Sequence, residues 1–144
     1  MITVRRAGIS DAAVIQLLNK ECLGYDYPLS EVETHLQALL ENPGHEILVG
    51  VLDEELVVGY LHLADYDTLY FEPMKNILGI AVFTEFRRRG VATRLLSAGE
   101  QWARDTGATG IRLVSGVSRE EAHAFYERMG YEMSHLQKNF RKML

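Results

Sequence analysis

The stretch NILGIAVFTEFRRRGVATRLLSAG (residues 76–99) joins an apolar run to an amphipathic pattern through a short basic turn. After Asn76, residues 77–83 have no polar side chain, as expected for a central strand over 76–83 that is covered on both faces. From Val91 the apolar residues recur at helical spacing as far as Ala103, and Gly107 is the expected stop. The stretch therefore predicts a strand, a turn containing Gly90, and a helix.

Alternating strand and helix patterns extend from this unit in both directions. Strands are predicted at 2–7, 46–52, 56–64 and 111–115, and two last antiparallel strands at 131–136 and 137–144. Residues 65–75 are predicted to form an irregular connection or frayed strand ends. Helices are predicted from Ser10 or Asp11 to Cys22, from a capping box of Ser30 and Glu33 to about Asn42, and from a second capping box of Ser118 and Glu121 to Gly130.

This order predicts an α/β or α+β domain with a mixed sheet. Strands 76–83 and 111–115, joined through a helix, should be parallel neighbours with a right-handed connection. Ligands of such sheets bind at the carboxyl ends of the strands. A length of 144 residues without an internal linker predicts one domain over 1–144.

Composition narrows the classes of function. The net charge of −5 argues against a surface built to bind nucleic acid. The sequence contains no run of about 18 apolar residues, so we expect no membrane partner. The first residues lack the apolar stretch of a signal peptide, so we expect a cytoplasmic location, in agreement with a single cysteine, Cys22. The five histidines lie at no ligand spacing from one another or from Cys22, so we expect no metal site.

The turn between strand and helix has the properties of an anion site. The first N–H groups of a helix lack internal acceptors and carry partial positive charge, and Gly90 leaves their approach open. Arg87, Arg88 and Arg89 add full charges suited to phosphate, although the same three residues also fit a merely solvated helix start. Neither G-x-G-x-x-G nor G-x-x-x-x-G-K-[ST] is present, which disfavours a Rossmann dehydrogenase or a P-loop NTPase.

Two motifs together resemble the GNAT superfamily of N-acetyltransferases. Ile80-Ala81-Val82 followed by residues 87–92 (RRRGVA) is similar to that family's acetyl-CoA motif, and residues 125–131 (FYERMGY) resemble its second marker. The resemblance covers nearly the whole chain. It implies a mixed, mostly antiparallel central sheet with a splayed parallel strand pair, flanked by about four helices.

The resemblance also implies roles for individual residues. Backbone groups of Ile80, Ala81 and Val82 would pair with pantetheine and hold the thioester carbonyl. Amides from Arg88 through Thr93, including those of Gly90, Val91 and Ala92, would bind the pyrophosphate. Tyr126 matches the tyrosine that protonates the departing thiolate, although its place on an apolar stripe also fits a core residue. Arg119 stands where many members have asparagine and is a candidate phosphate contact, while Val114 stands where some have a glutamate base.

The resemblance therefore implies an acetyl-CoA-dependent N-acetyltransferase, in which a primary amine of a small molecule or peptide attacks the thioester directly. The alternative is a non-catalytic acyl-CoA-binding or sensing domain. Candidates for relaying the amine's proton are His62, Asp65 and Glu72, each of which also fits an ordinary strand or loop role. We expect Tyr25, Asp26 and Tyr27, together with residues 66–74, to select the acceptor. A homodimer is possible in this family.

Overall fold

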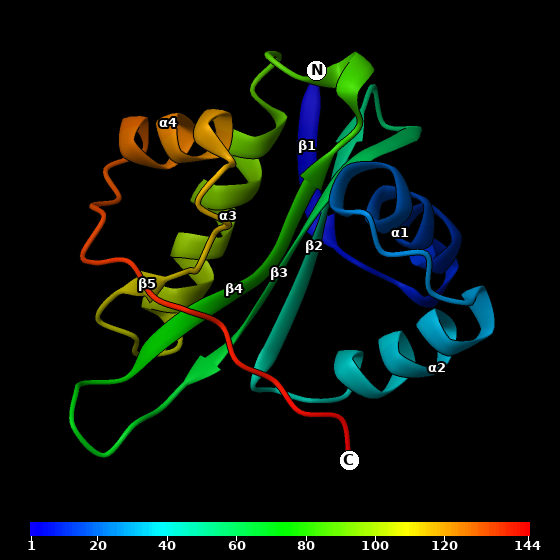
Figure 1. Ribbon diagram of the computed structural model, residues 1–144. Helices are drawn as coiled ribbons and strands as arrows, with labels where there is room; N and C mark the ends of the chain where they lie inside the picture. The colour runs from blue at the N-terminus through cyan, green and yellow to red at the C-terminus, as the bar shows by residue number, and fades with distance from the viewer. The chain divides into compact units, whose positions relative to one another are not determined.

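The computed structural model describes residues 1–144, which divide into two compact units, residues 1–113 and 114–144. The first unit contains a five-stranded sheet in the order β1-β2-β3-β4-β5 (Figure 1). Its strands are β1 (Ile2–Arg6), β2 (His45–Leu52), β3 (Leu56–Tyr66), β4 (Met74–Val82) and β5 (Ile111–Arg112). The first three pairings are antiparallel and the last is parallel, which confirms the mixed sheet.

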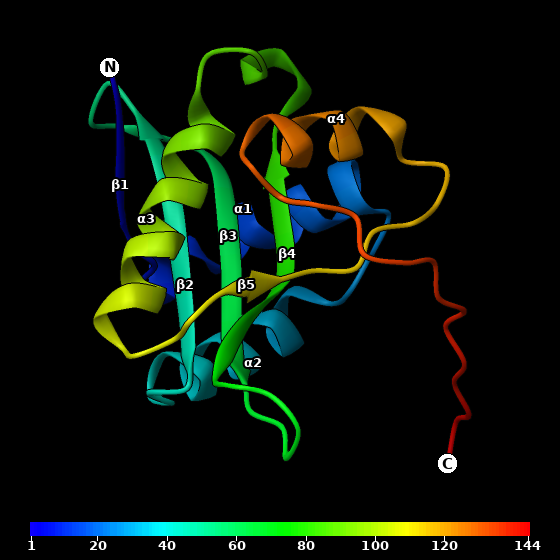
Figure 2. The ribbon, with the colours of Figure 1, turned by 90° about the vertical axis from the view of Figure 1, so that its left-hand side faces the viewer.

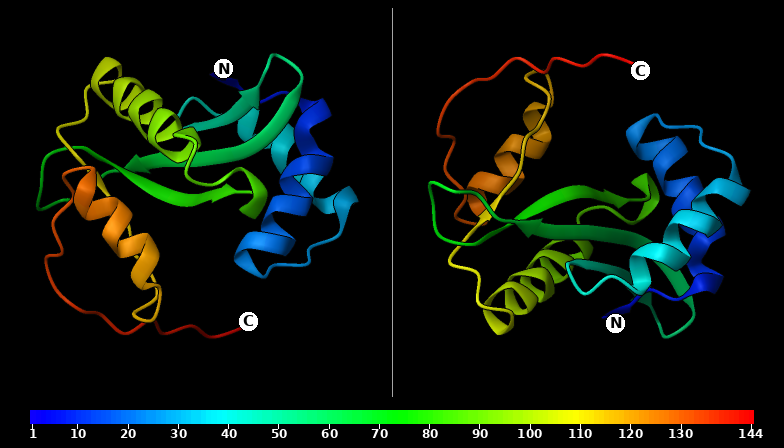
Figure 3. Two further views of the ribbon diagram at one scale, coloured as in Figure 1. Left: turned by 90° about the horizontal axis from the view of Figure 1, so that it is seen from above. Right: turned by 90° about the horizontal axis from the view of Figure 1, so that it is seen from below.

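Helices cover both faces of this sheet. Two helices, α1 (Ala12–Leu18) and α2 (Leu29–Leu40), lie on one face, and α3 (Val91–Asp105) lies on the other, as the views from above and below show (Figure 3). A single π-helical turn, Asn19–Leu23, follows α1 and ends at Gly24, whose φ of 79° is left-handed. None of the helices is long and apolar enough to cross a membrane.

Close packing fixes α3 against the sheet. Leu95 and Leu96 are fully buried, and Val91 is 2% exposed. At Gly99 a methyl group would lie only 2.8 Å from Leu61 Cδ2, so a larger residue would push the helix away from β3. Because Gly99 permits this approach, the first turn of α3 is held at a fixed place beside the end of β4.

β4 is bent by a bulge and then separates from β5. Its register with β3 shifts between His62 and Leu63, which pair with Gly79 and Ile77, so Leu78 is the extra residue. On its other side β4 pairs with β5 only at Lys75 and Asn76 (Figure 2). The parallel splayed pair is thus confirmed, but β5 ends at Arg112 rather than at 115, because the diverging β4 leaves the later residues without a partner strand.

The second unit contains α4 (Glu120–Arg128), and Gly130 follows it with a left-handed φ of 92°. The prediction of two strands at 131–136 and 137–144 is wrong, because residues 131–144 form no helix or strand. This unit contains no strand to pair with, residues 132–144 are all exposed, and an isolated hairpin is only marginally stable in water.

The predicted side-chain caps of the helices are also wrong. The backbone carbonyl of Pro28 accepts the first N–H groups of α2, which places Ser30 inside the helix. α4 begins after Arg119 with no side-chain cap, although Ser118 precedes it. Asp11 does precede α1, but its buried carboxylate accepts hydrogen bonds from the Gly8 N–H and the Arg5 guanidinium instead.

Candidate functional site

The turn between β4 and α3 has an unusual backbone conformation. After a 3-10 turn at Thr84–Phe86, Arg88 has a φ of 63° and Gly90 a φ of 85°. A residue with a side chain is less stable in the left-handed region by about 1–2 kcal/mol. Interactions of the surrounding structure therefore have to offset this strain at Arg88. At Gly90 the space that a Cβ would occupy contains no atom within 4 Å. The turn is therefore open in front of Gly90.

The N–H groups along this turn are without acceptors. The Arg94 N–H donates to the Gly90 carbonyl at 3.0 Å and begins the helical ladder, whereas the N–H groups of residues 88–93 donate to no group of the protein. No acidic side chain lies in the first turn of α3, and Gly90 provides no cap. A helix start with this many open donors is suited to an anion with several oxygen atoms.

The three arginines of the turn are placed differently from one another. Arg87 points its Nε at the carbonyl oxygen of Val82, at 3.2 Å, so it is held against the end of β4. The Arg89 guanidinium lies 5.4 Å from the centre of the Phe86 ring. Arg88 is exposed and takes part in no hydrogen bond or ion pair. Neither Arg88 nor Arg89 is in an ion pair, and of the three arginines Arg88 alone has neither a hydrogen bond nor a ring contact.

Beyond Asn76, one edge of β4 has no partner strand. The Phe83 N–H donates to the Val58 carbonyl on β3. Because backbone groups alternate in direction along a strand, the N–H groups of Val82 and Ile80 point away from β3, toward the unpaired edge. Ala81, which pairs with Tyr60, has its N–H directed at β3 and its side chain buried. The open edge thus presents backbone groups of Ile80 and Val82.

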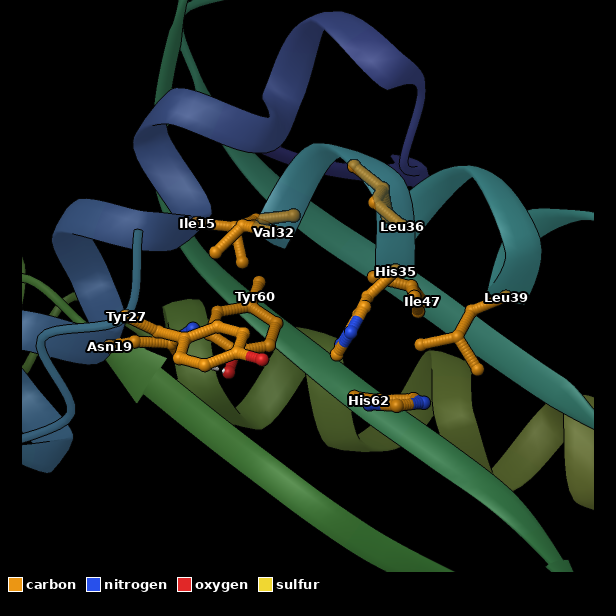
Figure 4. Close-up of a pocket in the computed structure, with 10 residues that line it drawn as sticks. All are labelled: Ile15, Asn19, Tyr27, Val32, His35, Leu36, Leu39, Ile47, Tyr60 and His62. Carbon is orange, nitrogen blue, oxygen red and sulfur yellow. Dashed lines mark hydrogen bonds between the residues drawn. The ribbon is translucent and has the colours of Figure 1, made fainter. Parts of the chain in front are cut away.

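On the face of the sheet that α1 and α2 cover, these helices and the strands β2 and β3 line a cavity of about 150 Å³ that is partly open to solvent (Figure 4). Its walls are mainly aliphatic, with polar atoms from five side chains. The lining residues are Ile15, Asn19, Tyr27, Val32, His35, Leu36, Leu39, Ile47, Tyr60 and His62.

Two hydrogen bonds order the polar side of this cavity. The buried Tyr60 hydroxyl donates to Asn19 Oδ1, and His62 Nε2 lies 2.9 Å from His45 Nδ1. Burial, followed by the proximity of Cys22, raises the pKa of Tyr60 to about 12. Burial, followed by His45, lowers the pKa of His62 to about 4. His62 is therefore neutral at physiological pH, and its Nδ1 has no hydrogen-bond partner.

The two acidic candidates for a proton relay differ from His62. Asp65 accepts a hydrogen bond from Lys75, whose side chain is almost fully buried and lies 4.2 Å from the centre of the Trp102 ring. Removing the Asp65 charge would leave a buried ammonium unpaired, so this carboxylate has a structural role. Glu72 is exposed in the β3–β4 loop and has no ion-pair partner. Among the three candidates, His62 alone lines the cavity.

Tyr126 and Arg119 belong to the second unit. The Tyr126 ring contacts those of Phe125 and Tyr131, with centroids 5.5 and 6.1 Å apart. Burial raises the pKa of Tyr126, and the nearby charge of Arg119 acts against this rise. Its phenol thus stays protonated at neutral pH. Val114 is exposed, and the three loop residues Tyr25, Asp26 and Tyr27 are exposed in the first unit, where only Tyr27 lines the cavity.

Cys22 and Asn19 have places in the site that sequence reasoning missed. The Cys22 thiol donates to the Val82 carbonyl at 3.4 Å, the same oxygen that Arg87 contacts. Burial raises the pKa of this thiol, and the Arg87 charge partly opposes the shift. The spacing of Cys22 on a helical stripe indicated a core position, but nothing in the sequence indicated its contact with β4.

No group of three or more His, Cys, Asp or Glu residues is placed to hold a metal ion.

Comparison with known proteins finds a matching family model and several related chains. A family model described as "Acetyltransferase (GNAT) family" matches residues 12–131. An "Uncharacterized N-acetyltransferase YhfO" of Bacillus subtilis is 31% identical over 137 residues, which cover 91% of this chain and 90% of that protein. An "N-alpha-acetyltransferase" of Saccharolobus solfataricus is 28% identical over 139 residues, covering 90% and 80%.

Solved structures share the fold at low identity. The structure of AAC(6')-Iy with the bisubstrate analog CoA-S-monomethyl-acetylneamine superposes with a TM-score of 0.88 at 18% identity, covering 100% of this chain and 99% of that one. At this identity the likeness describes the fold alone.

Proposed function

The chain belongs to the GNAT family of acetyltransferases and is an acetyl-CoA-dependent N-acetyltransferase; from this premise we propose that it transfers the acetyl group to a primary amine by direct attack on the thioester. The observation that carries the proposal is the adjacency of two sets of open backbone donors. One set is the N–H groups of residues 88–93, and the other lies on the unpaired edge of β4 just before them.

The residues present fit coenzyme A in this place. A diphosphate requires several converging donors, and residues 88–93 offer them in front of the open space at Gly90. The charge of Arg88 is free to add a contact, with Arg89 beside it, whereas Arg87 orders the end of β4. Arg119 is proposed as a further phosphate contact from the second unit.

The edge of β4 fits the rest of the donor substrate. Pantetheine contains two amide groups, which can pair with backbone groups of Ile80 and Val82 as a neighbouring strand would. Ala81 supports this segment through its buried side chain. An N–H group aimed at the thioester oxygen stabilises the negative charge that develops there as the amine attacks. The amine then forms the C–N bond, and the C–S bond breaks to release the thiolate.

Two protons have to move during this reaction. We propose that His62 accepts the proton that the nitrogen loses and passes it through His45 toward solvent, because the two imidazoles already lie at hydrogen-bond distance. We propose that Tyr126 donates a proton to the thiolate. On reference pKa values this transfer is uphill by about 2 kcal/mol, and the raised pKa of Tyr126 widens that gap unless the thiolate is also desolvated.

The proposal also covers the organisation of the chain. Residues 1–144 act as one acetyltransferase domain, since the family model spans parts of both units. The partners are acetyl-CoA and the amine. A cytoplasmic location, a homodimer, and the lack of nucleic-acid and membrane partners stay predictions.

An assay of thiol release over a panel of amines tests the function. The purified protein, given acetyl-CoA, should release coenzyme A at a rate that depends on the amine and saturates with it, and the acetylated amine should appear in equal amount by mass spectrometry. A rate of thiol release that does not change with the identity or concentration of any amine would contradict the proposal.

A further inference from the structure

We propose that the cavity between the α1/α2 layer and the sheet holds an apolar side group of the acceptor amine, about the size of a phenyl ring. This inference rests on the proposed function, because it assumes that the cavity's occupant is the acetylated amine. It specifies the acceptor as an arylalkylamine or an amine of similar apolar character rather than a polycation.

The size and walls of the cavity carry the first step. A volume of about 150 Å³ is similar to that of engineered apolar cavities that bind benzene. The aliphatic wall consists of Ile15, Val32, Leu36, Leu39 and Ile47. A ring placed among these side chains loses contact with water, and the Tyr60 hydroxyl stays hydrogen-bonded to Asn19, whereas the unpaired Nδ1 of His62 has to remain reachable by water or by the amine.

The lining of the cavity contains no charged side chain that would bind a second ammonium group. None of the lining residues is an aspartate, glutamate, lysine or arginine. His62 is neutral at physiological pH, since its pKa is about 4. A second ammonium group inside the cavity would have to lose its hydration without an opposite charge among the lining residues, since the Glu31 carboxylate, 3.9 Å from His35 Nε2, is exposed and lies outside the lining. The cavity therefore disfavours amines that carry several positive charges.

The pairing of β3 with β4 places the cavity close to the unpaired edge of β4, where the thioester is proposed to lie. Tyr60 and His62, which form the strand wall of the cavity, pair with Ala81 and Gly79 on β4. Neighbouring strands lie roughly 5 Å apart, so the wall is one strand away from the edge that presents Ile80 and Val82. Gly79 has no side chain of its own, but the Tyr60 hydroxyl and Leu23 Cδ1 lie 3.1 and 3.8 Å from where its Cβ would be, so the link of the acceptor would pass beside these two groups. A two-carbon link between ring and nitrogen matches this span.

The test compares three probe amines in the thiol-release assay: phenethylamine, methylamine and neamine. We expect kcat/KM to be at least tenfold higher for phenethylamine than for the other two. Leu39→Trp should fill the cavity from α2 and lower kcat/KM for phenethylamine at least tenfold, and by a clearly larger factor than for methylamine, which has no side group to place there. Ala38→Trp, at the neighbouring exposed position, is the matched control and should leave all three values unchanged.

A second variant and a binding measurement keep the result decisive. Tyr27→Ala removes an exposed wall of the cavity without disturbing the core, and should weaken phenethylamine selectively. Calorimetry should show phenethylamine binding that Leu39→Trp abolishes. Acetylation of all three amines at similar kcat/KM would overturn the inference and leave the proposed function standing. Phenethylamine binding that Leu39→Trp abolishes, with no acetylation of the three probes but acetylation of other amines in the panel, would overturn the inference that the occupant of the cavity is the acetylated amine and leave the proposed function standing. No acetylation of any amine in the panel would instead overturn the proposed function.

Discussion

Arg87 Nε donates a 3.2 Å hydrogen bond to the carbonyl oxygen of Val82, so the first arginine of the RRRG turn is held by the strand that precedes it. The same oxygen accepts the Cys22 thiol. A carbonyl that would otherwise face the unpaired edge of β4 is thus satisfied by two side chains. This leaves the neighbouring N–H groups as the open donors of that edge, and it separates the role of Arg87 from that of Arg88.

The separation predicts different effects of removing each arginine. Arg87→Ala loses a charge-assisted hydrogen bond and should lower the free energy of unfolding by about 1–2 kcal/mol in urea titrations. Arg88→Ala should change that free energy by less than about 0.5 kcal/mol, because Arg88 is exposed and unpaired. Instead it should weaken coenzyme A binding and reduce the salt dependence of that binding. Equal stability losses in the two variants would contradict the assignment.

Gly90→Asp should weaken coenzyme A binding at least tenfold in calorimetry, because it places a carboxylate in front of the N–H groups of residues 88–93. Gly107→Asp is the matched control. Gly107 has the same φ of 85° and equally open surroundings, but it lies beyond the carboxyl end of α3. The two variants therefore share the backbone strain and differ in the place of the charge. If both lowered affinity alike, the effect would be one of strain rather than of the phosphate site.

Tyr126→Phe should lower kcat at least tenfold while the dissociation constant of coenzyme A changes less than twofold, because only the proton donor is lost. Phe125→Leu is a control for the loss of aromatic packing, since the two rings are in contact. Unchanged turnover in Tyr126→Phe would remove this residue as the acid. It would also weaken the distinction from a non-catalytic acyl-CoA-binding domain.

The lowered pKa of His62 should make the free energy of unfolding depend on pH. Burial and His45 lower its pKa to about 4, below the value of 6.5 in the unfolded chain. The folded state therefore takes up this proton less readily, so the stability that the neutral ring contributes is complete above pH 6.5. It is lost as the pH falls from 6.5 to about 4, by up to about 3 kcal/mol. His62→Gln should flatten this part of the profile in urea titrations at a series of pH values, whereas an unchanged slope would contradict it.

Much of the fold could be predicted because it depends on local patterns. The apolar run before Thr84 and the helical stripe from Val91 specify β4 and α3, and Gly107 and Gly130 mark helix ends where a left-handed residue is needed. The strands predicted over 131–144 are wrong because alternation of apolar residues says nothing about whether a partner strand is available.

The candidate site was less visible in the sequence. The RRRG turn indicated an anion site, but nothing in it distinguished Arg87 from Arg88, because the difference depends on the direction of the Val82 carbonyl. The bulge at Leu78 has no sequence signal, and the cavity brings His62 together with Leu39 from another element. Such features depend on register and on packing between distant segments.

The central claim is that backbone N–H groups at the start of α3 bind the diphosphate of coenzyme A. A crystal structure of the full chain with coenzyme A tests it most directly. We expect diphosphate oxygens within hydrogen-bond distance of N–H groups among residues 88–93, and pantetheine along the edge of Ile80 and Val82. A nucleotide bound elsewhere on the chain, with these N–H groups still facing solvent, would contradict it.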